Sequence, residues 1–392
     1  MPLFDKQHAR PRTVRLLGTR GVPASYGGFE TAAENVGRYL IKMGWRVVVY
    51  CQTEGSGGVK VDTWEGFDRI TIPVRGSGAL AAAKFDWASA LHAARSSDSC
   101  IVFGYNTAII NVLQRIRRSP LVINMDGIEW RRERWSRGQR AFLRANERLA
   151  RVIAHEVIAD HPEIETYLAE TTPTSKITMI PYGADAVHKA PIEPVEQLGL
   201  VPGNYFTLIC RPVQENSILE IVRAYSRRPR GVKLVILGNY DGDHDPYHRA
   251  VLDAAGAEIV FPGAIFDPTI TQALRFHSLG YLHGHTVGGT NPSLVEAMAA
   301  ANPVIARSNA YNRWVAGDAG MYFEDEDDID RMVDELLASP ELQMRLSRNS
   351  RSRHADLFTW EIIGAEYERL LIKHGGFSSE TVDEARTAGS RA

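Results

Sequence analysis

Residues Leu282–Ala306, LHGHTVGGTNPSLVEAMAAANPVIA, place a glycine-rich turn between the end of an apolar strand and the start of an apolar helix. The turn contains Gly284, Gly288 and Gly289, and the Thr-Asn-Pro-Ser sequence after it is typical of a helix start. Backbone N–H groups at such a start favour a phosphate group, and the helix dipole adds to this preference. Glu296, the one acid of the helix, can accept hydrogen bonds from ribose hydroxyls. The segment therefore predicts a nucleotide-binding turn.

Strand-like and helix-like segments alternate around this turn throughout the second half of the chain. The apolar runs typical of buried parallel strands are Tyr205–Cys210, Lys233–Gly238, Ile259–Phe261 and Pro303–Ala306. Segments with helical periodicity lie between them, at Ser217–Tyr225, His248–Ala255 and Pro268–Phe276. Repeated β-α-β units of this kind predict a parallel, doubly wound sheet whose ligands bind at the carboxyl ends of the strands.

The first half of the chain has the same alternation. Its apolar runs are Val14–Gly18, Arg46–Cys51, Cys100–Gly104 and Leu121–Met125. The first run leads into a loop with three glycines, Thr19–Glu30, and then into a helix-like segment, Thr31–Met43. The whole chain is therefore predicted to be an α/β protein with two Rossmann-like domains.

The predicted domains are residues 13–190 and residues 204–356, with a linker rich in Pro, Glu and Lys at Ala186–Gly203. Residues 357–375 are predicted to form a C-terminal crossover helix. Its apolar positions share one face that should dock on the body: Trp360, Ile363, Tyr367, Leu370 and Leu371. Residues 376–392 are small and polar, which predicts a disordered tail.

Charge and composition exclude several classes of protein. The chain has 392 residues with 45 Lys and Arg against 47 Asp and Glu, a balance that does not favour nucleic acid. Its three cysteines are far apart and lie in or beside apolar runs, which predicts buried thiols. The chain shows no metal-binding signature, no signal peptide and no apolar run long enough to span a membrane. We therefore expect a soluble, cytoplasmic protein without a metal.

A strongly basic helix is predicted near residues 134–152. Arginines recur at steps of three or four residues, at Arg137, Arg140, Arg144, Arg148 and Arg151. A solvated helix face is the favoured interpretation, because surface arginines are common. The alternative is a contact with anionic lipid headgroups, or with a diphosphate-linked lipid acceptor, at the inner face of a membrane.

Five blocks in a fixed order give the chain a resemblance to a known family. They are Gly21–Glu30 (GVPASYGGFE), Ile180–Asp185 (IPYGAD), Arg211 with Glu215-Asn216, His283–Glu296 (HGHTVGGTNPSLVE) and Phe358–Glu361 (FTWE). With them, residues 13–375 resemble a GT-B glycosyltransferase of the retaining family 4, and more narrowly the bacterial subgroup with rhamnosyltransferases of surface-polysaccharide assembly. The resemblance implies two domains facing across a cleft, with the donor bound mostly by the second and the acceptor mostly by the first.

The resemblance assigns most of the donor site to the second domain. Arg211 matches the arginine that neutralises the diphosphate, and Glu296 matches the second of two acids, the one that binds ribose. The donor-binding residues that it implies are Gly27, Gly28, Arg211, Asn216, Gly288, Gly289, Thr290, Asn291, Ser293 and Glu296. Helix dipole and basic side chains replace a metal in such enzymes, so neither a metal nor another cofactor is expected.

Two positions depart from the family pattern. Gly288 stands where the family has an acid that contacts the donor sugar, and Asn216 stands where it has a lysine. The glycine is compatible with a 6-deoxy or otherwise altered donor, with a role passed to His285 or Thr286, or with loss of activity. With one cation near the leaving group, the amides around residues 290–293 would carry more of the electrostatic stabilisation.

In the first domain, Gly27 and Gly28 would let the backbone approach the diphosphate or the sugar, or would only permit a tight turn. Asp126 follows a strand where the family often has a histidine; it could orient a sugar hydroxyl, act as a base, or cap the turn. Glu129 shares these interpretations. Three acceptor-side residues are predicted: Tyr26, Glu30 and Glu129.

The predicted catalytic residues are Asp126, Arg211 and His285. His285 is preferred to His161 because it belongs to the donor loop, although either ring could be structural. The resemblance implies a retaining, metal-independent hexosyltransferase, in which the leaving phosphate helps to deprotonate the acceptor.

The expected substrates are a dTDP-, UDP- or GDP-linked sugar, with L-rhamnose the leading choice, and a saccharide or lipid-linked acceptor of bacterial polysaccharide biosynthesis. A GT-B sugar-nucleotide epimerase and a non-catalytic nucleotide-sugar-binding partner remain as alternatives.

Overall fold

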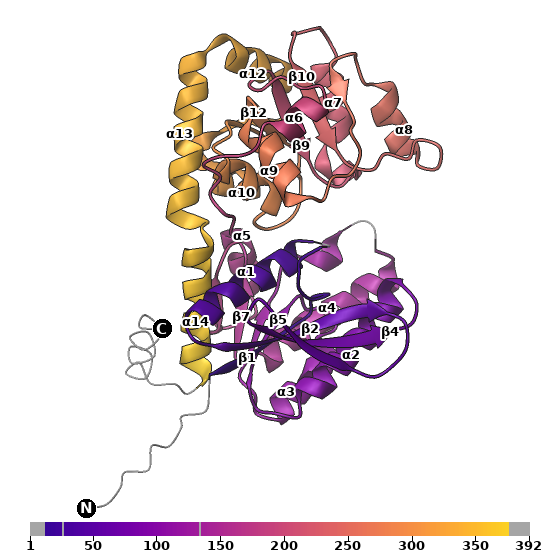
Figure 1. The fold of residues 1–392 in the computed structure, drawn as a ribbon, viewed down its shortest axis with the longest axis vertical. Helices are drawn as coiled ribbons and strands as arrows, with labels where there is room; N and C mark the ends of the chain where they lie inside the picture. Colours follow the sequence, from indigo (N-terminus) through magenta and orange to yellow (C-terminus); the bar gives the residue numbers. More distant parts are fainter. Residues whose placement is uncertain (1–11, 26, 133–134, 376–392) are drawn as a thin grey trace, which may run out of the picture. The chain divides into compact units, whose positions relative to one another are not determined.

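The computed structural model describes residues 12–25, 27–132 and 135–375. The chain divides into two compact units (Figure 1). Unit 1 comprises Met1–Ile180 with Glu361–Ala392, and unit 2 comprises Pro181–Trp360. Each unit is built around its own sheet, and the prediction of two doubly wound α/β domains is confirmed.

The sheet of unit 1 has the order β3-β4-β2-β1-β5-β6-β7-β8, and every neighbouring pair is parallel except β3 with β4. Its strands are β1 Thr13–Leu17, β2 Arg46–Glu54, β3 Lys60–Trp64, β4 Phe67–Val74, β5 Ser99–Phe103, β6 Leu121–Asn124, β7 Glu156–Ala159 and β8 Ile177–Met179. Its main helices before the crossover are α1 Gly28–Lys42, α2 Gly78–Ala93, α3 Val112–Ile116, α4 Arg137–Ile153 and α5 Pro162–Ala169, with 3-10 turns η1 Ala108–Asn111, η2 Glu129–Arg131 and η3 Thr174–Lys176.

The sheet of unit 2 is entirely parallel, in the order β11-β10-β9-β12-β13-β14. Its strands are β9 Tyr205–Ile209, β10 Lys233–Leu237, β11 Ile259–Val260, β12 Gly280–His283, β13 Val304–Arg307 and β14 Gly320–Phe323. Its helices are α6 Glu193–Gln197, α7 Ile218–Tyr225, α8 Pro246–Asp253, α9 Pro268–Phe276, α10 Pro292–Ala299, α11 Ala310–Ala316, α12 Glu326–Ala338 and α13 Pro340–Leu357, with 3-10 turns η4 Gln214–Asn216 and η5 Gly317–Ala319.

In both sheets the strand order reverses at one point. The chain of unit 1 moves outward from β1 through β2, and then outward on the other side from β5 through β8. In unit 2 the chain moves outward from β9 through β11 on one side, and from β12 through β14 on the other, so the reversal lies between β9 and β12. The loops that leave the two central strands in opposite directions open a crevice at their carboxyl ends, which is where doubly wound sheets bind ligands.

The last helix, α14 Trp360–Gly375, belongs to unit 1 apart from its first residue. Its predicted apolar face is buried, with no more than 6% exposure at any of the five positions. It approaches α1 so closely that a Cβ on Gly364 would lie 2.3 Å from Cγ of Tyr39. Buried hydrogen bonds join Trp45 Nε1 to Glu368 and Asn124 Nδ2 to the Tyr367 hydroxyl.

The boundary between the units corrects the predicted domain limits. Residues 181–190, predicted to close the first domain, lie in unit 2. There the N–H of Ala184 donates to the Phe358 carbonyl, and the N–H of Val187 donates to the Ala299 carbonyl. The predicted linker is also wrong, because it contains α6, and Val195 and Leu200 are buried in a cluster with β9, β10 and α9. The polar residues of this segment lie on its exposed side, whereas Val195 and Leu200 lie on its buried side.

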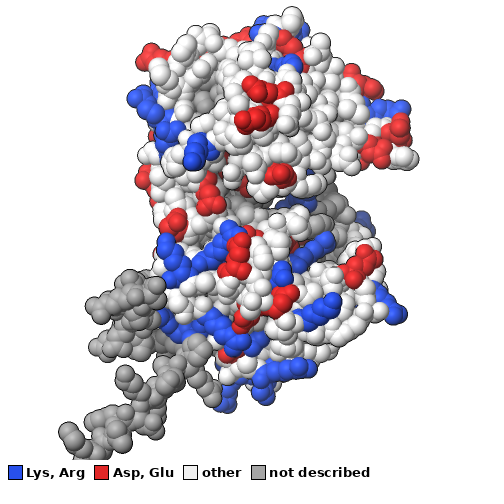
Figure 2. Space-filling model, viewed as in Figure 1, with Lys and Arg blue, Asp and Glu red and all other residues white. Residues whose placement is uncertain are grey.

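Surface charge is mixed on the face that Figure 2 shows, where acidic and basic side chains alternate on both units. Among the described residues, no helix is both long and apolar enough to cross a membrane. The three cysteines are free, with Cys51 and Cys100 buried and Cys210 partly exposed. Arg134, the expected start of the basic helix, and the tail 376–392 lie outside the described residues, and α4 begins at Arg137.

Candidate functional site

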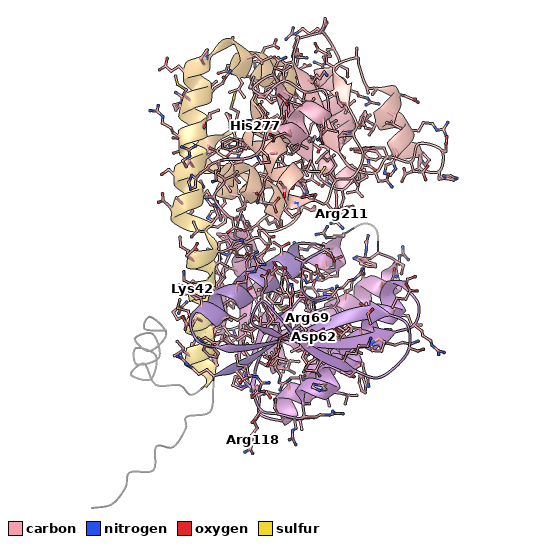
Figure 3. The ribbon with its side chains drawn as sticks, viewed as in Figure 1. Lys42, Asp62, Arg69, Arg118, Arg211 and His277 are labelled. Carbon is pink, nitrogen blue, oxygen red and sulfur yellow. The ribbon has the colours of Figure 1, made fainter. Side chains whose placement is uncertain are left out.

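The strand reversal of unit 2 brings together two predicted segments. Arg211 follows β9, and the glycine-rich turn follows the neighbouring strand β12. The Arg211 side chain is exposed (Figure 3) and forms no ion pair with any carboxylate in the described part of the chain. An exposed cation at this crevice is available to a phosphate group.

Side-chain hydrogen bonds hold the two segments in register. The Ser293 hydroxyl donates to the Ile209 carbonyl at the end of β9, at 2.6 Å, and receives a 2.8 Å hydrogen bond from the Tyr281 hydroxyl. The N–H and hydroxyl of Thr286 both donate to the Glu215 carbonyl at 2.9 Å. The turn after β12 is therefore anchored at both of its ends, to the end of β9 and to the turn that follows β9.

Gly284 is required by a close approach of the backbone. A Cβ at this position would lie 2.1 Å from the carbonyl oxygen of Asn216. Asn216 is 2% exposed, and its Nδ2 donates to the Arg211 carbonyl at 2.7 Å. The Asn216 amide thus holds the backbone that presents Arg211.

The start of α10 offers fewer amides than predicted. Asn291 is the N-cap, and its side-chain oxygen accepts the N–H of Ser293 at 3.0 Å. Pro292 has no N–H to offer. Within residues 290–293, positions 292 and 293 therefore offer no unbonded amide in this conformation.

Glu296 lies one turn inside α10 and is paired with an arginine that the sequence reasoning missed. Its Oε2 lies 2.6 Å from Nη2 of Arg275, on α9. The Arg275 side chain is 6% exposed, whereas that of Glu296 is 35% exposed. The buried Arg275 thus binds one oxygen of the Glu296 carboxylate, while the Glu296 side chain stays partly exposed to solvent. No sequence spacing marks this pair, because α9 and α10 come into contact only in the folded unit.

Two histidines stack at the carboxyl end of β12. The rings of His283 and His285 lie 4.4 Å apart at an interplanar angle of 10°. Burial lowers the pKa of His283 well below its usual value, and the neighbouring His285 adds to this effect. The His285 carbonyl accepts hydrogen bonds from Asn309 and Asn312, both at 2.9 Å. His285 is partly exposed, so it is the ring of the pair that a ligand could reach.

The glycine-rich turn itself remains open. Gly288 has a backbone φ of +135°, a value that residues with a side chain rarely adopt. A Cβ there would meet no atom within 4 Å. Gly289 follows it and is partly exposed, and Thr290 is buried. The position of a side chain at residue 288 is thus open space, with no described atom within 4 Å of it.

In unit 1, the glycine-rich loop after β1 is tied to α1. Gly27 is the N-cap of α1 and provides no side-chain hydrogen bond, and Gly28 is the first helical residue. Glu30 Oε1 accepts the N–H of Arg20 at 2.9 Å, and Glu34 Oε2 accepts the N–H of Ala24 at 2.6 Å. Glu30 is 7% exposed. It shapes this loop, a structural task that the acceptor-side prediction did not anticipate. Tyr26 lies outside the described residues.

The two acids after β6 have different surroundings. Asp126 is partly exposed and has φ +53°, and the Asn124 side chain accepts its N–H at 2.9 Å. Left-handed backbone at a non-glycine residue often accompanies a functional site. Glu129 is 7% exposed, and its two oxygens accept from Arg132 Nε at 2.8 Å and Trp135 Nε1 at 3.0 Å. These contacts favour a structural carboxylate at residue 129.

His161 has a structural role in this unit. It is fully buried, and its Nδ1 accepts the N–H of Glu163 as the N-cap of α5. No group of three or more His, Cys, Asp or Glu side chains within the described ranges could hold a metal ion. The expectation of a metal-independent reaction stays a prediction.

These features define the class of fold. Two doubly wound sheets, a glycine-rich turn at the strand reversal of the second, and a C-terminal helix that returns to the first unit are the architecture of GT-B glycosyltransferases, and the fold of this chain is GT-B.

Solved structures of this class are similar over almost the whole chain. Sucrose-phosphate synthase from Thermosynechococcus elongatus has a TM-score of 0.74 at 17% identity, covering 92% of this chain and 98% of its own. HepE from Anabaena, in complex with UDP and glucose, has a TM-score of 0.71 at 15% identity, covering 92% and 99%. An α,α-trehalose-phosphate synthase (UDP-forming) from Burkholderia xenovorans has a TM-score of 0.70 at 11% identity, covering 91% and 99%.

At the level of sequence, a family model described as a domain of unknown function (DUF1972) matches residues 11–185. No curated protein matches the chain. The matched residues end close to the boundary of unit 1 at Ile180, so this match concerns unit 1.

Proposed function

We propose that the chain is a glycosyltransferase that moves a sugar from a nucleotide diphosphate sugar to a hydroxyl of a saccharide or lipid-linked acceptor. The observation that carries this proposal is the strand reversal of unit 2, where Arg211 follows β9 and Glu296 lies in α10, the helix after the neighbouring strand β12. An exposed guanidinium suits the diphosphate, and a half-exposed carboxylate suits the ribose. The UDP and glucose named in the HepE structure support this class of donor.

The proposed reaction breaks the bond between the anomeric carbon and the leaving phosphate oxygen and forms a bond from that carbon to the acceptor oxygen. The acceptor proton passes to the leaving diphosphate, whose charge Arg211 stabilises. Asp126 and His285 are proposed to orient sugar hydroxyls. Retention of configuration and independence from metal belong to this proposal, and so do L-rhamnose as the sugar and a role in bacterial polysaccharide assembly.

Open space at Gly288 supports a donor that differs from a common hexose. An acid at this position would contact a sugar hydroxyl, and the glycine leaves that hydroxyl without a partner or matches a sugar that lacks it. A 6-deoxy sugar such as rhamnose is consistent with this loss. The same glycine favours the second candidate, a nucleotide-sugar-binding protein without turnover.

The test is a thermal-shift panel with dTDP-, UDP- and GDP-sugars, followed by measurement of free nucleotide in the presence of candidate acceptors. A transferase should show a shift with one donor and nucleotide release only when an acceptor is added. An epimerase would instead change the sugar of the donor without an acceptor, which NMR of the sugar signals detects. A shift without release or epimerisation for all combinations would contradict the enzyme, and no shift at all would contradict the donor site.

A further inference from the structure

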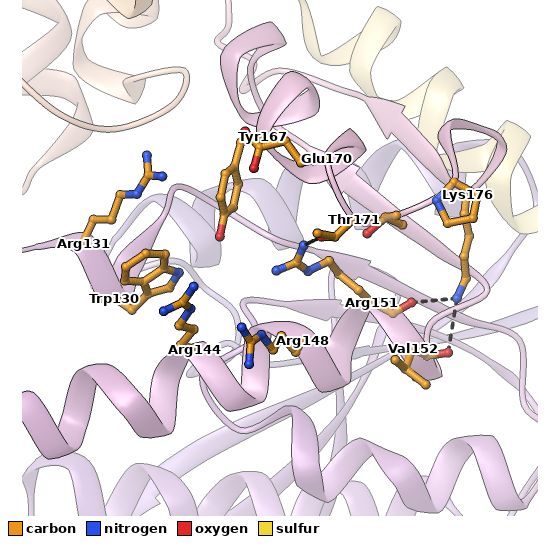
Figure 4. A pocket seen from close by; sticks show the side chains of 12 residues that line it. Trp130, Arg131, Arg144, Arg148, Arg151, Val152, Tyr167, Glu170, Thr171 and Lys176 are labelled. Atoms are coloured by element: carbon orange, nitrogen blue, oxygen red, sulfur yellow. Dashed lines mark hydrogen bonds between the residues drawn. The ribbon is translucent and has the colours of Figure 1, made fainter.

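Unit 1 contains a basic cavity that shares no residue with the predicted donor site. It has a volume of about 610 Å³ and lies between the second half of α4 and the end of α5 (Figure 4). Five cationic side chains line it together with a single carboxylate, Glu170; they are Arg131, Arg144, Arg148, Arg151 and Lys176. The volume falls in the range of small-molecule sites.

Three of these arginines have no carboxylate partner in the described part of the chain. Arg131, Arg144 and Arg148 are exposed and form no ion pair there. Figure 4 shows the guanidinium groups of Arg144, Arg148 and Arg151 directed into the same space. Like charges held together at a concave surface repel one another, and an anion between them relieves this repulsion. Three of the regularly spaced arginines of α4 therefore line the cavity: Arg144, Arg148 and Arg151.

Aromatic rings hold the guanidinium groups in place. Arg144 lies 4.9 Å from the centre of the Trp130 ring, and Arg131 lies 5.0 Å from the centre of the Tyr167 ring. Contacts of this kind orient a cation without neutralising its charge. The guanidinium groups therefore keep their N–H donors for another partner.

A buried carboxylate organises both aromatic walls. Glu147 is 1% exposed, and its oxygens accept from Trp130 Nε1 at 2.6 Å and from the Tyr167 hydroxyl at 2.8 Å. It also pairs with Arg151, which donates in addition to the Thr171 hydroxyl. The cavity is thus a built structure, because its aromatic rings and one of its cations are fixed by a buried group.

From these observations we infer that the cavity binds a phosphate or diphosphate ester group. Arginine forms paired N–H···O bonds with phosphate oxygens, and several arginines around one concave site suit a group with two or more negative charges. The group can belong to a soluble molecule or to a lipid headgroup, since both present the same chemistry. This inference does not depend on the proposed transfer, because no residue of the cavity belongs to the donor site.

The test uses inorganic pyrophosphate and vesicles of phosphatidylcholine with a minority of phosphatidic acid. The cavity variant is Arg144→Ala with Arg148→Ala, two exposed residues whose removal leaves Glu147 paired with Arg151. The control variant is Arg345→Ala with Arg348→Ala, two exposed arginines on α13 of unit 2 without ion pairs to described residues. Both variants remove two positive charges from a helix surface.

We expect the cavity variant to bind pyrophosphate about tenfold more weakly or worse in calorimetric titration, and the control variant to bind it like the natural protein. The same titration in Arg211→Ala should retain this binding, which separates the cavity from the donor site. For the lipid source, vesicle binding should depend on the cavity pair and be displaced by pyrophosphate. Absence of binding to both probes, or equal losses in the cavity and control variants, would overturn the inference.

Discussion

The guanidinium group of Arg275 and the carboxylate of Glu296 form an ion pair, with 2.6 Å between Nη2 and Oε2. Arg275 Nη2 also donates to the Ser293 hydroxyl at 3.2 Å. One buried arginine thus orients two predicted donor-binding residues of α10. If Glu296 receives the ribose hydroxyls, Arg275 is the residue that positions it.

We predict that Glu296→Gln weakens UDP binding by about tenfold, because a neutral amide is a poorer acceptor for two hydroxyls. Arg275→Met should weaken binding as well, although it leaves the carboxylate in place. The double variant should lose less than the sum of the two, since both act through one contact. Calorimetric titration with UDP measures all three affinities. Unchanged affinity in Glu296→Gln would contradict the ribose role, and additive losses would contradict positioning by Arg275.

The close approach at Gly284 gives a prediction about stability. Gly284→Ala places a Cβ 2.1 Å from the Asn216 carbonyl oxygen, so the two turns must separate. We expect a loss of about 2–3 kcal/mol in the free energy of unfolding, in the range of an overpacked core, with weaker nucleotide binding in the folded fraction. Gly138→Ala on α4, where a Cβ meets nothing within 4 Å, is the control and should cause no loss. Urea denaturation compares them, and equal midpoints would show that the turns can relax.

Substitutions of Asp126 and Glu129 should have different effects: the first should lower activity, and the second should lower stability. Asp126→Asn keeps a residue that tolerates φ +53°, so the thermal midpoint should stay unchanged while the transfer rate falls at least tenfold. Glu129→Gln disturbs contacts to Arg132 and Trp135, and we expect it to cost about 1–3 kcal/mol of stability. Its folded fraction should retain the transfer rate. The reverse pattern, with activity lost in Glu129→Gln at full stability, would assign the chemistry to Glu129.

Sequence periodicity was sufficient for the fold and for the positions of the glycine-rich turns. Apolar runs and helical spacing mark buried strands and packed helices directly, and the apolar face of α14 was predicted residue by residue. The prediction failed at residues 186–203, where Val195 and Leu200 are buried within a polar segment. Composition averages over a segment, whereas burial depends on two or three side chains.

The contacts that the site residues make could not be predicted from the sequence. Arg275 meets Glu296, and Tyr167 meets Arg131, only after strands have brought separate helices together. The arginine spacing of α4 was visible, but the cavity beside it depends on α5. Within residues 308–357, which form β14 and the helices α11 to α13, no individual helix or strand was predicted.

Glu156 gives a prediction about pH, because it fastens the C-terminal helix to unit 1. It is 1% exposed, and it accepts from Lys373 Nζ at 2.8 Å, His374 Nε2 at 2.7 Å and the Thr178 hydroxyl at 2.6 Å. Burial raises the pKa of Glu156, but the hydrogen bonds from Lys373, Thr178 and His374 outweigh it, so the pKa lies below its ordinary value of 4.5. The charged form is therefore favoured in the folded protein.

A carboxylate with a lowered pKa stabilises the folded state above its unfolded pKa, and this contribution is lost as the pH falls through the folded value. Glu156→Gln should thus cost about 2 kcal/mol at pH 7 and progressively less below pH 4.5. Glu366→Gln on the same helix breaks only an exposed pair with Arg369 and should cost less than about 0.5 kcal/mol at either pH. Urea midpoints of the natural protein and both variants, measured from pH 7 to pH 4, test this. A cost for Glu156→Gln that stays constant over this range would show that packing, and not the charge of Glu156, holds α14 in place.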